Sequence, residues 1–278
     1  MRYVIDHATV KKLALYFKDP GTQQLIDVAE EVDPQAQMVE SILEKYGAFE
    51  KAALYITGIA AISYMLSVKG EEHWMIAAQQ ASSDPAVDLL KFASFSPSVN
   101  FNRGARLKRI ERLLGYEHFF YSRISQYLAD LNMLRSDLAS ILKADKDAKT
   151  VVFAVKMFYY SARKAGINVK VPLEIPLPVD RRICLISLLS GIIKGGAPTL
   201  RDARTLLMNA SGLVRQAWDT VGRESGIPPL RIDALLWLLG GCYEKKRGAE
   251  QALEIASSML SPKSPRAFLA LRLLLGLK

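Results

Sequence analysis

The chain has 278 residues, half of them apolar and under a quarter charged, which excludes a disordered chain and allows a substantial core. Its 37 basic and 28 acidic residues give a formal charge of +9, which favours a polyanionic partner, either nucleic acid or an anionic membrane surface. The two cysteines, Cys184 and Cys242, are too few for a four-thiolate iron–sulfur cluster or a cysteine-rich zinc site, so we expect buried thiols.

Signals for metal binding, membrane insertion and export are missing from the sequence. The three histidines, His7, His73 and His118, lack metal-ligand spacing, and we expect no metal. The longest apolar stretch, residues 52–66, is shorter than the roughly 20 residues that a membrane span needs and predicts a buried core helix. Because the N-terminus also lacks an apolar run with a cleavage site, we expect a soluble cytoplasmic protein.

Apolar residues recur at helical spacing along almost the whole chain. A turn at residues 19–22 closes the first helix, and a weak β-alternation is confined to residues 169–175. The sequence therefore predicts an all-α fold without internal repeats. The predicted helices cover residues 10–17, 22–31, 38–46, 48–68, 72–82, 86–94, 105–115, 117–130, 134–142, 148–164, 181–194, 199–221, 230–244, 248–259 and 264–276.

The densest basic cluster follows a polar loop at residues 94–104. It consists of Arg106, Lys108, Arg109 and Arg112. The cluster suggests a stripe that faces DNA phosphates, although a solvated helix face explains any one of these residues equally well.

A tight polar turn joins the helix that ends at Leu142 to the next one, for which Asp147 is the predicted N-cap. Such a helical hairpin can bind a DNA phosphate through its free backbone N–H groups. Lys149 would lie in the first helical turn, where the helix dipole favours a neutral amine that can form a Schiff base. Lys156, two turns further on, is the rival nucleophile. Phe153 shares the face of Lys149 and could flank an extruded base or belong to the core.

Three prolines, Pro172, Pro176 and Pro178, forbid a helix and stiffen an extended run that ends at Asp180. A new helix begins at this carboxylate. A stiff segment that brings an acid near a helix-borne lysine fits amine-nucleophile chemistry, and the two features together indicate a lysine-dependent DNA glycosylase.

Four strings then match one family in order and at similar spacing: KGEEHW (69–74), KTVVF (149–153), IPLPVD (175–180) and GIPPLRIDALLW (226–237). The chain resembles the archaeal 8-oxoguanine DNA glycosylase (AGOG) family, a branch of the helix-hairpin-helix superfamily, from about residue 33 to residue 237. Two features depart from the wider superfamily. The hairpin turn lacks Gly-x-Gly, and no four-cysteine cluster loop is present.

The resemblance implies that Lys149 is the Schiff-base nucleophile and Asp180 its acidic partner. It also implies a base pocket formed by Gln35, Ser63, Trp74, Phe153, Pro178, Asp233 and Trp237. From the residues alone, Trp237 would be assigned to a core helix, and Asp233 and Gln35 could be helix caps.

We therefore expect two helical lobes with the active site in the cleft between them. One lobe, residues 35–165, would carry the hairpin and Lys149, and the other, residues 1–34 plus 166–278, would carry Asp180. The expected protein is a monomeric base-excision-repair enzyme that needs no cofactor. It would excise 8-oxoguanine from double-stranded DNA, with single strands as a second candidate substrate, and would nick the strand by β-elimination. The alternatives are a non-enzymatic helix-hairpin-helix DNA-binding protein and a helical adaptor.

Overall fold

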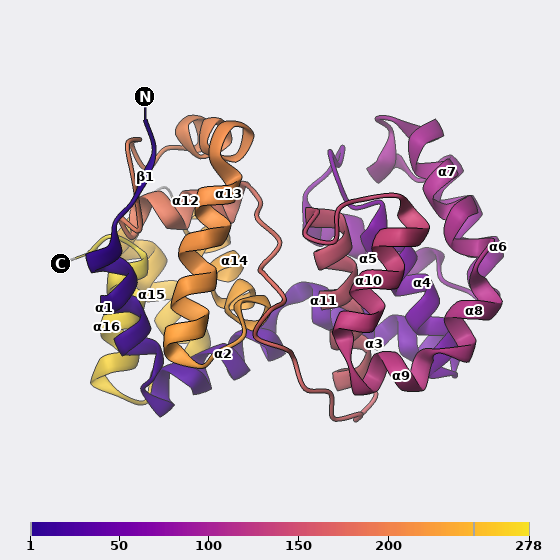
Figure 1. Ribbon diagram of the computed structural model, residues 1–278, viewed down its shortest axis with the longest axis horizontal. Helices are drawn as coiled ribbons and strands as arrows, with labels where there is room; N and C mark the ends of the chain where they lie inside the picture. Colours follow the sequence, from indigo (N-terminus) through magenta and orange to yellow (C-terminus); the bar gives the residue numbers. More distant parts are fainter. Residues whose placement is uncertain (1, 247, 278) are drawn as a thin grey trace. The chain divides into compact units, whose positions relative to one another are not determined.

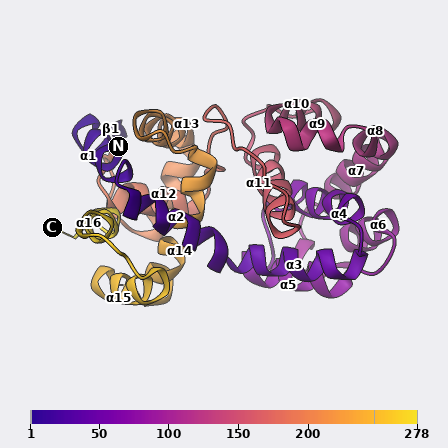
Figure 2. The same ribbon diagram turned by 90° about the horizontal axis from the view of Figure 1, so that it is seen from below.

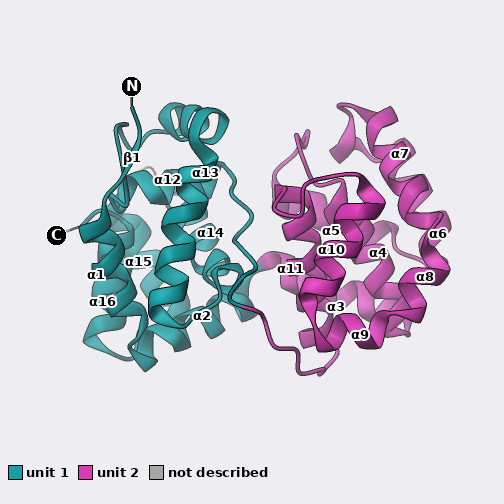
Figure 3. Ribbon diagram, in the orientation of Figure 1, with its two compact units in different colours: residues 1–33, 173–278 teal, residues 34–172 magenta. Residues whose placement is uncertain are grey.

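The computed structural model describes residues 2–246 and 248–277, whose regular secondary structure is almost entirely helical (Figure 1). The prediction of an all-α fold is confirmed. The chain divides into two compact units, unit 1 with residues 1–33 and 173–278, and unit 2 with residues 34–172 (Figure 3).

Unit 2 is built around α11, whose side chains from Thr150 to Ala162 are all buried. Helix α4 packs along it, and because α4 is apolar on every face, residues 52–61 are buried as predicted. Helices α3 and α5 lie side by side (Figure 2). The helices of unit 2 are α3 (Pro34–Tyr46), α4 (Phe49–Ala61), α5 (Gly70–Gln80), α6 (Pro85–Phe95), the 3-10 helix η1 (Pro97–Val99), α7 (Arg103–Leu114), α8 (Glu117–Ser122), α9 (Ile124–Ala129), α10 (Leu131–Leu142) and α11 (Lys149–Lys164).

Unit 1 packs α12 against α13 and α14, and α1 against α13. Two short antiparallel strands pair Val4 with Lys194 and Ile5 with Ile193. Both cysteines are buried, free thiols, as predicted. The elements of unit 1 are β1 (Val4–Ile5), α1 (His7–Phe17), α2 (Pro20–Val32), α12 (Arg181–Leu189), β2 (Ile193–Lys194), α13 (Leu200–Ser225), α14 (Pro229–Lys246), α15 (Ala249–Leu260) and α16 (Pro265–Leu274).

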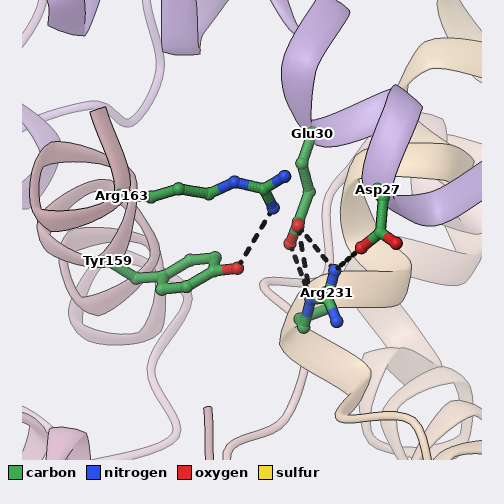
Figure 4. Close-up of polar contacts among 5 residues, drawn as sticks. All are labelled: Asp27, Glu30, Tyr159, Arg163 and Arg231. Atoms are coloured by element: carbon green, nitrogen blue, oxygen red, sulfur yellow. Dashed lines mark hydrogen bonds and ion pairs between the residues drawn. The ribbon is translucent and has the colours of Figure 1, made fainter. Parts of the chain in front are cut away.

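A buried carboxylate ties α14 to α2 within unit 1 (Figure 4). Arg231 places its Nη2 2.8 Å from Oε2 of Glu30, whose side chain is almost fully buried, and also pairs with Asp27. In unit 2, the same view shows Arg163 donating to the Tyr159 hydroxyl at 3.4 Å within α11. The charged hydrogen bonds of Arg231 satisfy a carboxylate that burial would otherwise penalise.

Helix α4 ends at Ala61, so the helix predicted over residues 48–68 was too long. The cause is Arg106 of α7, whose guanidinium donates to the carbonyls of Ile62, at 3.2 Å, and Met65, at 3.1 Å, and holds this segment outside the helix. Met65 adopts a left-handed backbone conformation with φ of 45°, which is incompatible with a continuing helix.

Four other predictions differ from the structure. The helix predicted over residues 117–130 is two helices, α8 and α9, which meet at Arg123. The helix predicted over residues 181–194 ends earlier because its last two residues pair with β1. Residues 169–175 form no strand and include a turn at residues 173–174, and the turn at residues 19–22 begins α2. Among the described residues, no helix is long and apolar enough to cross a membrane.

Candidate active site

The hairpin turn between α10 and α11 is held by a buried arginine. Arg135, which is 6% exposed, donates from Nε to the carbonyl of Lys146 at 3.2 Å and pairs with the carboxylate of Asp147. The N-cap of α11 is Ala148, without a side-chain hydrogen bond. The prediction that Asp147 is the N-cap was therefore wrong, because Arg135 takes its carboxylate.

We expect Arg135→Met to lower the free energy of unfolding by about 2–3 kcal/mol, since it leaves a turn carbonyl and a carboxylate without their charged donor. Urea denaturation measures this change. Arg112→Met, on the exposed face of α7, is the control and should change the stability by less than about 0.5 kcal/mol. Equal stabilities of the two variants would contradict the clamping role of Arg135.

Lys149 is the first residue of α11 and is exposed, whereas the rest of the helix is buried as far as Ala162. The rival nucleophile, Lys156, is 1% exposed, and its ammonium lies 5.0 Å from the ring centroid of Tyr160. In unit 2, α11 therefore presents one of the two candidate lysines to solvent and encloses the other.

Two aromatic side chains of the predicted pocket lie together one turn beyond Lys149. Phe153 and Trp74 meet edge to face, with ring centroids 6.2 Å apart. Phe153 is 9% exposed and Trp74 only 1%. Trp74 therefore packs against Phe153 inside unit 2 and has little open ring surface of its own.

The basic cluster on α7 is not a uniform phosphate-facing stripe. Arg106 is fully buried and serves the loop that follows α4, which corrects its predicted role. Arg109 is half-buried and donates to the Thr150 hydroxyl at 3.0 Å, directly beside Lys149. Lys108 is exposed, and like Arg112 it remains available to a polyanion.

Ser63 begins a buried hydrogen-bonded chain at the end of α4. Its hydroxyl donates to the carbonyl of Ile59 at 2.8 Å, and its oxygen lies 2.8 Å from Nε2 of His73. Nδ1 of His73 lies 2.9 Å from the hydroxyl of Ser98, which lies 2.8 Å from that of Ser96. Burial, reinforced by the charge of Arg106, lowers the pKa of His73 to about 3, so the ring is neutral at physiological pH.

Because His73 is buried in its neutral form, we expect the folded protein to lose stability at acidic pH. The unfolded chain binds a proton below the ordinary histidine pKa of 6.5, whereas folded His73 stays neutral until about pH 3, so stability is lost as the pH falls through this window. We expect the free energy of unfolding to fall by about 2 kcal/mol between pH 7 and pH 5 from this residue. Urea denaturation at both pH values should show this loss in the native chain and less of it in His73→Gln. An equal loss in both would exclude His73 as the cause.

Gln35 lies in the first turn of α3 and is 4% exposed, close to the 5% exposure of Ser63. Both are polar side chains of unit 2 that burial leaves almost inaccessible to bulk water.

In unit 1, the extended run after residue 173 leads to Asp180, which caps α12. Its Oδ1 accepts from the N–H of Ile183 at 3.0 Å, and the side chain remains half-exposed. Pro178, two residues earlier, is buried. The capping bond fixes the carboxylate in place while one of its oxygens stays available.

Trp237 is not an ordinary core residue of α14, since it is half-exposed and its ring is covered by Arg182, whose guanidinium carbon lies 4.1 Å from the ring centroid. Glu244 binds Nε of Arg182 at 3.0 Å. Gly240 makes this packing possible, because a Cβ there would lie 2.8 Å from that of Arg182. Asp233 is 2% exposed and lies in the second turn of α14, so it is not the helix cap.

The sequence did not single out Arg182 or His73 as part of a site. The adjacent Gly240 and Gly241 inside an apolar helix were the available signal for a large side chain packed against them. Among residues 2–246 and 248–277, no group of three histidine, cysteine or acidic side chains could hold a metal ion.

Several known proteins are similar to this chain. A family model described as AGOG, N-glycosylase/DNA lyase, matches residues 17–266. An N-glycosylase/DNA lyase of Pyrobaculum aerophilum is 33% identical over 225 residues, covering 79% of this chain and 81% of the relative. One from Thermococcus kodakarensis is 32% identical over 88% and 89% of the two chains. The crystal structure of 8-oxoguanosine-complexed Pa-AGOG, an 8-oxoguanine DNA glycosylase from Pyrobaculum aerophilum, matches with a TM-score of 0.73 and 26% identity over 96% of this chain and 97% of that one.

Proposed function

Because the chain belongs to the AGOG family of N-glycosylase/DNA lyases, we propose that it excises 8-oxoguanine from DNA and then cuts the strand. The observation that carries the proposal is Lys149, an exposed lysine at the first residue of an otherwise buried helix, directly after a clamped hairpin turn. The 8-oxoguanosine bound by the structural neighbour supports the choice of base.

In the proposed mechanism, the neutral amine of Lys149 attacks C1′ of the damaged nucleoside, and the C1′–N9 bond breaks. The departing base takes up a proton as it leaves. We assign assistance of this departure, and the later proton transfers, to Asp180. Loss of the lysine proton and opening of the sugar yield a Schiff base, which acidifies the C2′ proton. Removal of that proton breaks the C3′–O bond and nicks the strand, without a cofactor.

We propose that the polar side chains of Gln35, Ser63 and Asp233 bind the extruded base, because their hydrogen-bonding atoms suit the edge of an oxidised guanine. Trp237 offers a ring face backed by Arg182, and Phe153 offers one backed by Trp74. Pro178 contributes a rigid apolar surface.

The proposed substrate is duplex DNA, with single strands as a second possibility, and the proposed active form is a monomer located at the nucleoid. The formal charge of +9 supports binding to the DNA backbone, and exposed Lys108 and Arg112 are candidates for phosphate contacts.

A base-release assay on a duplex with a single 8-oxoguanine tests the proposal. We expect release of the free base, a nick on the 3′ side of the lesion, and a covalent protein–DNA adduct after borohydride reduction. A helix-hairpin-helix protein without enzymatic activity would bind DNA in a salt-sensitive manner but release no base. A helical adaptor would show no preference for the lesion. Either result would remove the proposed function.

A further inference from the structure

The buried chain Ser96–Ser98–His73–Ser63 has a single consistent direction. The carbonyl of Ile59 can only accept, so the hydroxyl proton of Ser63 points to it. The Ser63 oxygen must then accept from Nε2–H of His73 at 2.8 Å. A neutral imidazole carries one proton, so Nδ1 accepts from Ser98, whose own oxygen accepts from Ser96.

All four side chains of this chain are buried, with exposures from 0% to 5%. The ring of His73 is also held in place by aromatic neighbours, since Trp74 and Phe92 meet it edge to face with centroids 6.1 and 5.4 Å away. The tautomer and the ring position are therefore both set by the interior of unit 2, and hydrogen bonds in such a low-dielectric chain reinforce one another.

These hydrogen bonds fix the role that the Ser63 hydroxyl can play toward a further partner. A serine hydroxyl ordinarily rotates and can either donate or accept. Here its proton is committed to Ile59 and one lone pair to His73, so the remaining lone pair can only accept.

We propose that His73 is a specificity-determining positioning residue, which restricts Ser63 to accepting a hydrogen bond from the base. This inference rests on the proposed function, because it takes Ser63 as a base contact. Oxidation of guanine at C8 converts N7 from an acceptor into an N–H donor. A restricted acceptor bonds to that N–H, whereas it faces a lone pair on N7 of undamaged guanine. The buried chain thus favours the oxidised base.

The test measures the dissociation constants of two duplexes that differ by 8-oxoguanine or guanine at one position. It uses Lys149→Gln protein so that no turnover occurs. We expect His73→Phe, which keeps the ring packing, to lower the ratio of the two constants about tenfold, partly through tighter binding of guanine. His73→Gln keeps a donor near the Nε2 position and should restore most of the ratio. Ser63→Ala should lower it as His73→Phe does.

Unit 1 offers a matched control. Ser187 donates to the carbonyl of Ile183 at 2.7 Å and accepts from the indole N–H of Trp218 at 2.9 Å, the same arrangement without a predicted role in the pocket. Trp218→Phe should lower the melting temperature and leave the ratio unchanged. Loss of folding would weaken the binding of both duplexes by the same factor. If His73→Phe has this effect and leaves the ratio of the two dissociation constants unchanged, the proposal is overturned.

A direct measurement avoids dependence on variants. A long-range proton–nitrogen NMR spectrum of the native chain at pH 7 should show His73 as the Nε2–H tautomer, and an Nδ1–H tautomer would overturn the proposal. If the native chain shows this tautomer but no preference for 8-oxoguanine, the proposed function fails. If it prefers 8-oxoguanine and His73→Phe keeps the full preference, only the role of His73 fails.

Discussion

Lys149→Gln is expected to reduce base release at least about a thousandfold and to abolish borohydride trapping, because it removes the amine that forms the Schiff base. The side chain is exposed at the first residue of α11, so the substitution should leave the fold intact. Single-turnover base release and gel detection of the covalent adduct, both with an 8-oxoguanine duplex, measure the effect.

Substitutions of two further lysines serve as controls for this experiment. Lys146→Gln removes a similarly exposed charge from the turn just before α11 and should retain trapping, which separates nucleophilic chemistry from loss of positive charge. Lys156→Gln tests the rival inside the helix. Trapping that survives Lys149→Gln but disappears in Lys156→Gln would reassign the nucleophile.

Asp180→Asn is expected to lower the rate of base release at least about a hundredfold while folding and DNA binding persist. Asparagine caps a helix as well as aspartate does, so it can still accept from the N–H of Ile183 and preserve the start of α12. What it loses is the charge and the ability to exchange a proton. Base release in single-turnover reactions, dissociation constants and urea denaturation separate these effects.

The control is Asp84→Asn at the N-cap of α6, where the carboxylate accepts from the N–H groups of Ala86 and Val87. Like Asp180, it caps a helix, but it has no proposed part in the chemistry. We expect full activity from this variant. A rate of Asp180→Asn within threefold of the Asp84→Asn rate would remove Asp180 from the mechanism.

The helical architecture was predictable because apolar periodicity reports which face of a segment is buried. It correctly predicted the all-α fold and the buried helix α4. Periodicity cannot locate a helix end that depends on a distant partner. Helix α4 stops at Ala61 because Arg106, on another helix, binds the carbonyls that follow.

For the candidate site too, the sequence predicted some features and only the structure revealed others. Family strings in the sequence led to Lys149, Asp180 and the expected pocket residues, and the comparisons establish the family. The roles of individual residues stay predictions. What the sequence could not reveal is the support behind them, such as Arg182 behind Trp237 and the clamp of Arg135 on the hairpin turn.

The sequence by itself therefore determined the fold class, the enzyme family and the candidate residues, since local periodicity and ordered motifs carry that information along the chain. Only the tertiary structure decided the partner of each buried polar group. Asp147 is bound by Arg135 and does not cap α11. The hydroxyl of Ser63 donates to the carbonyl of Ile59, and its oxygen lies at hydrogen-bonding distance from His73. The physical reason is that a buried charge or hydroxyl must find a partner in space, and that partner need not lie nearby in sequence.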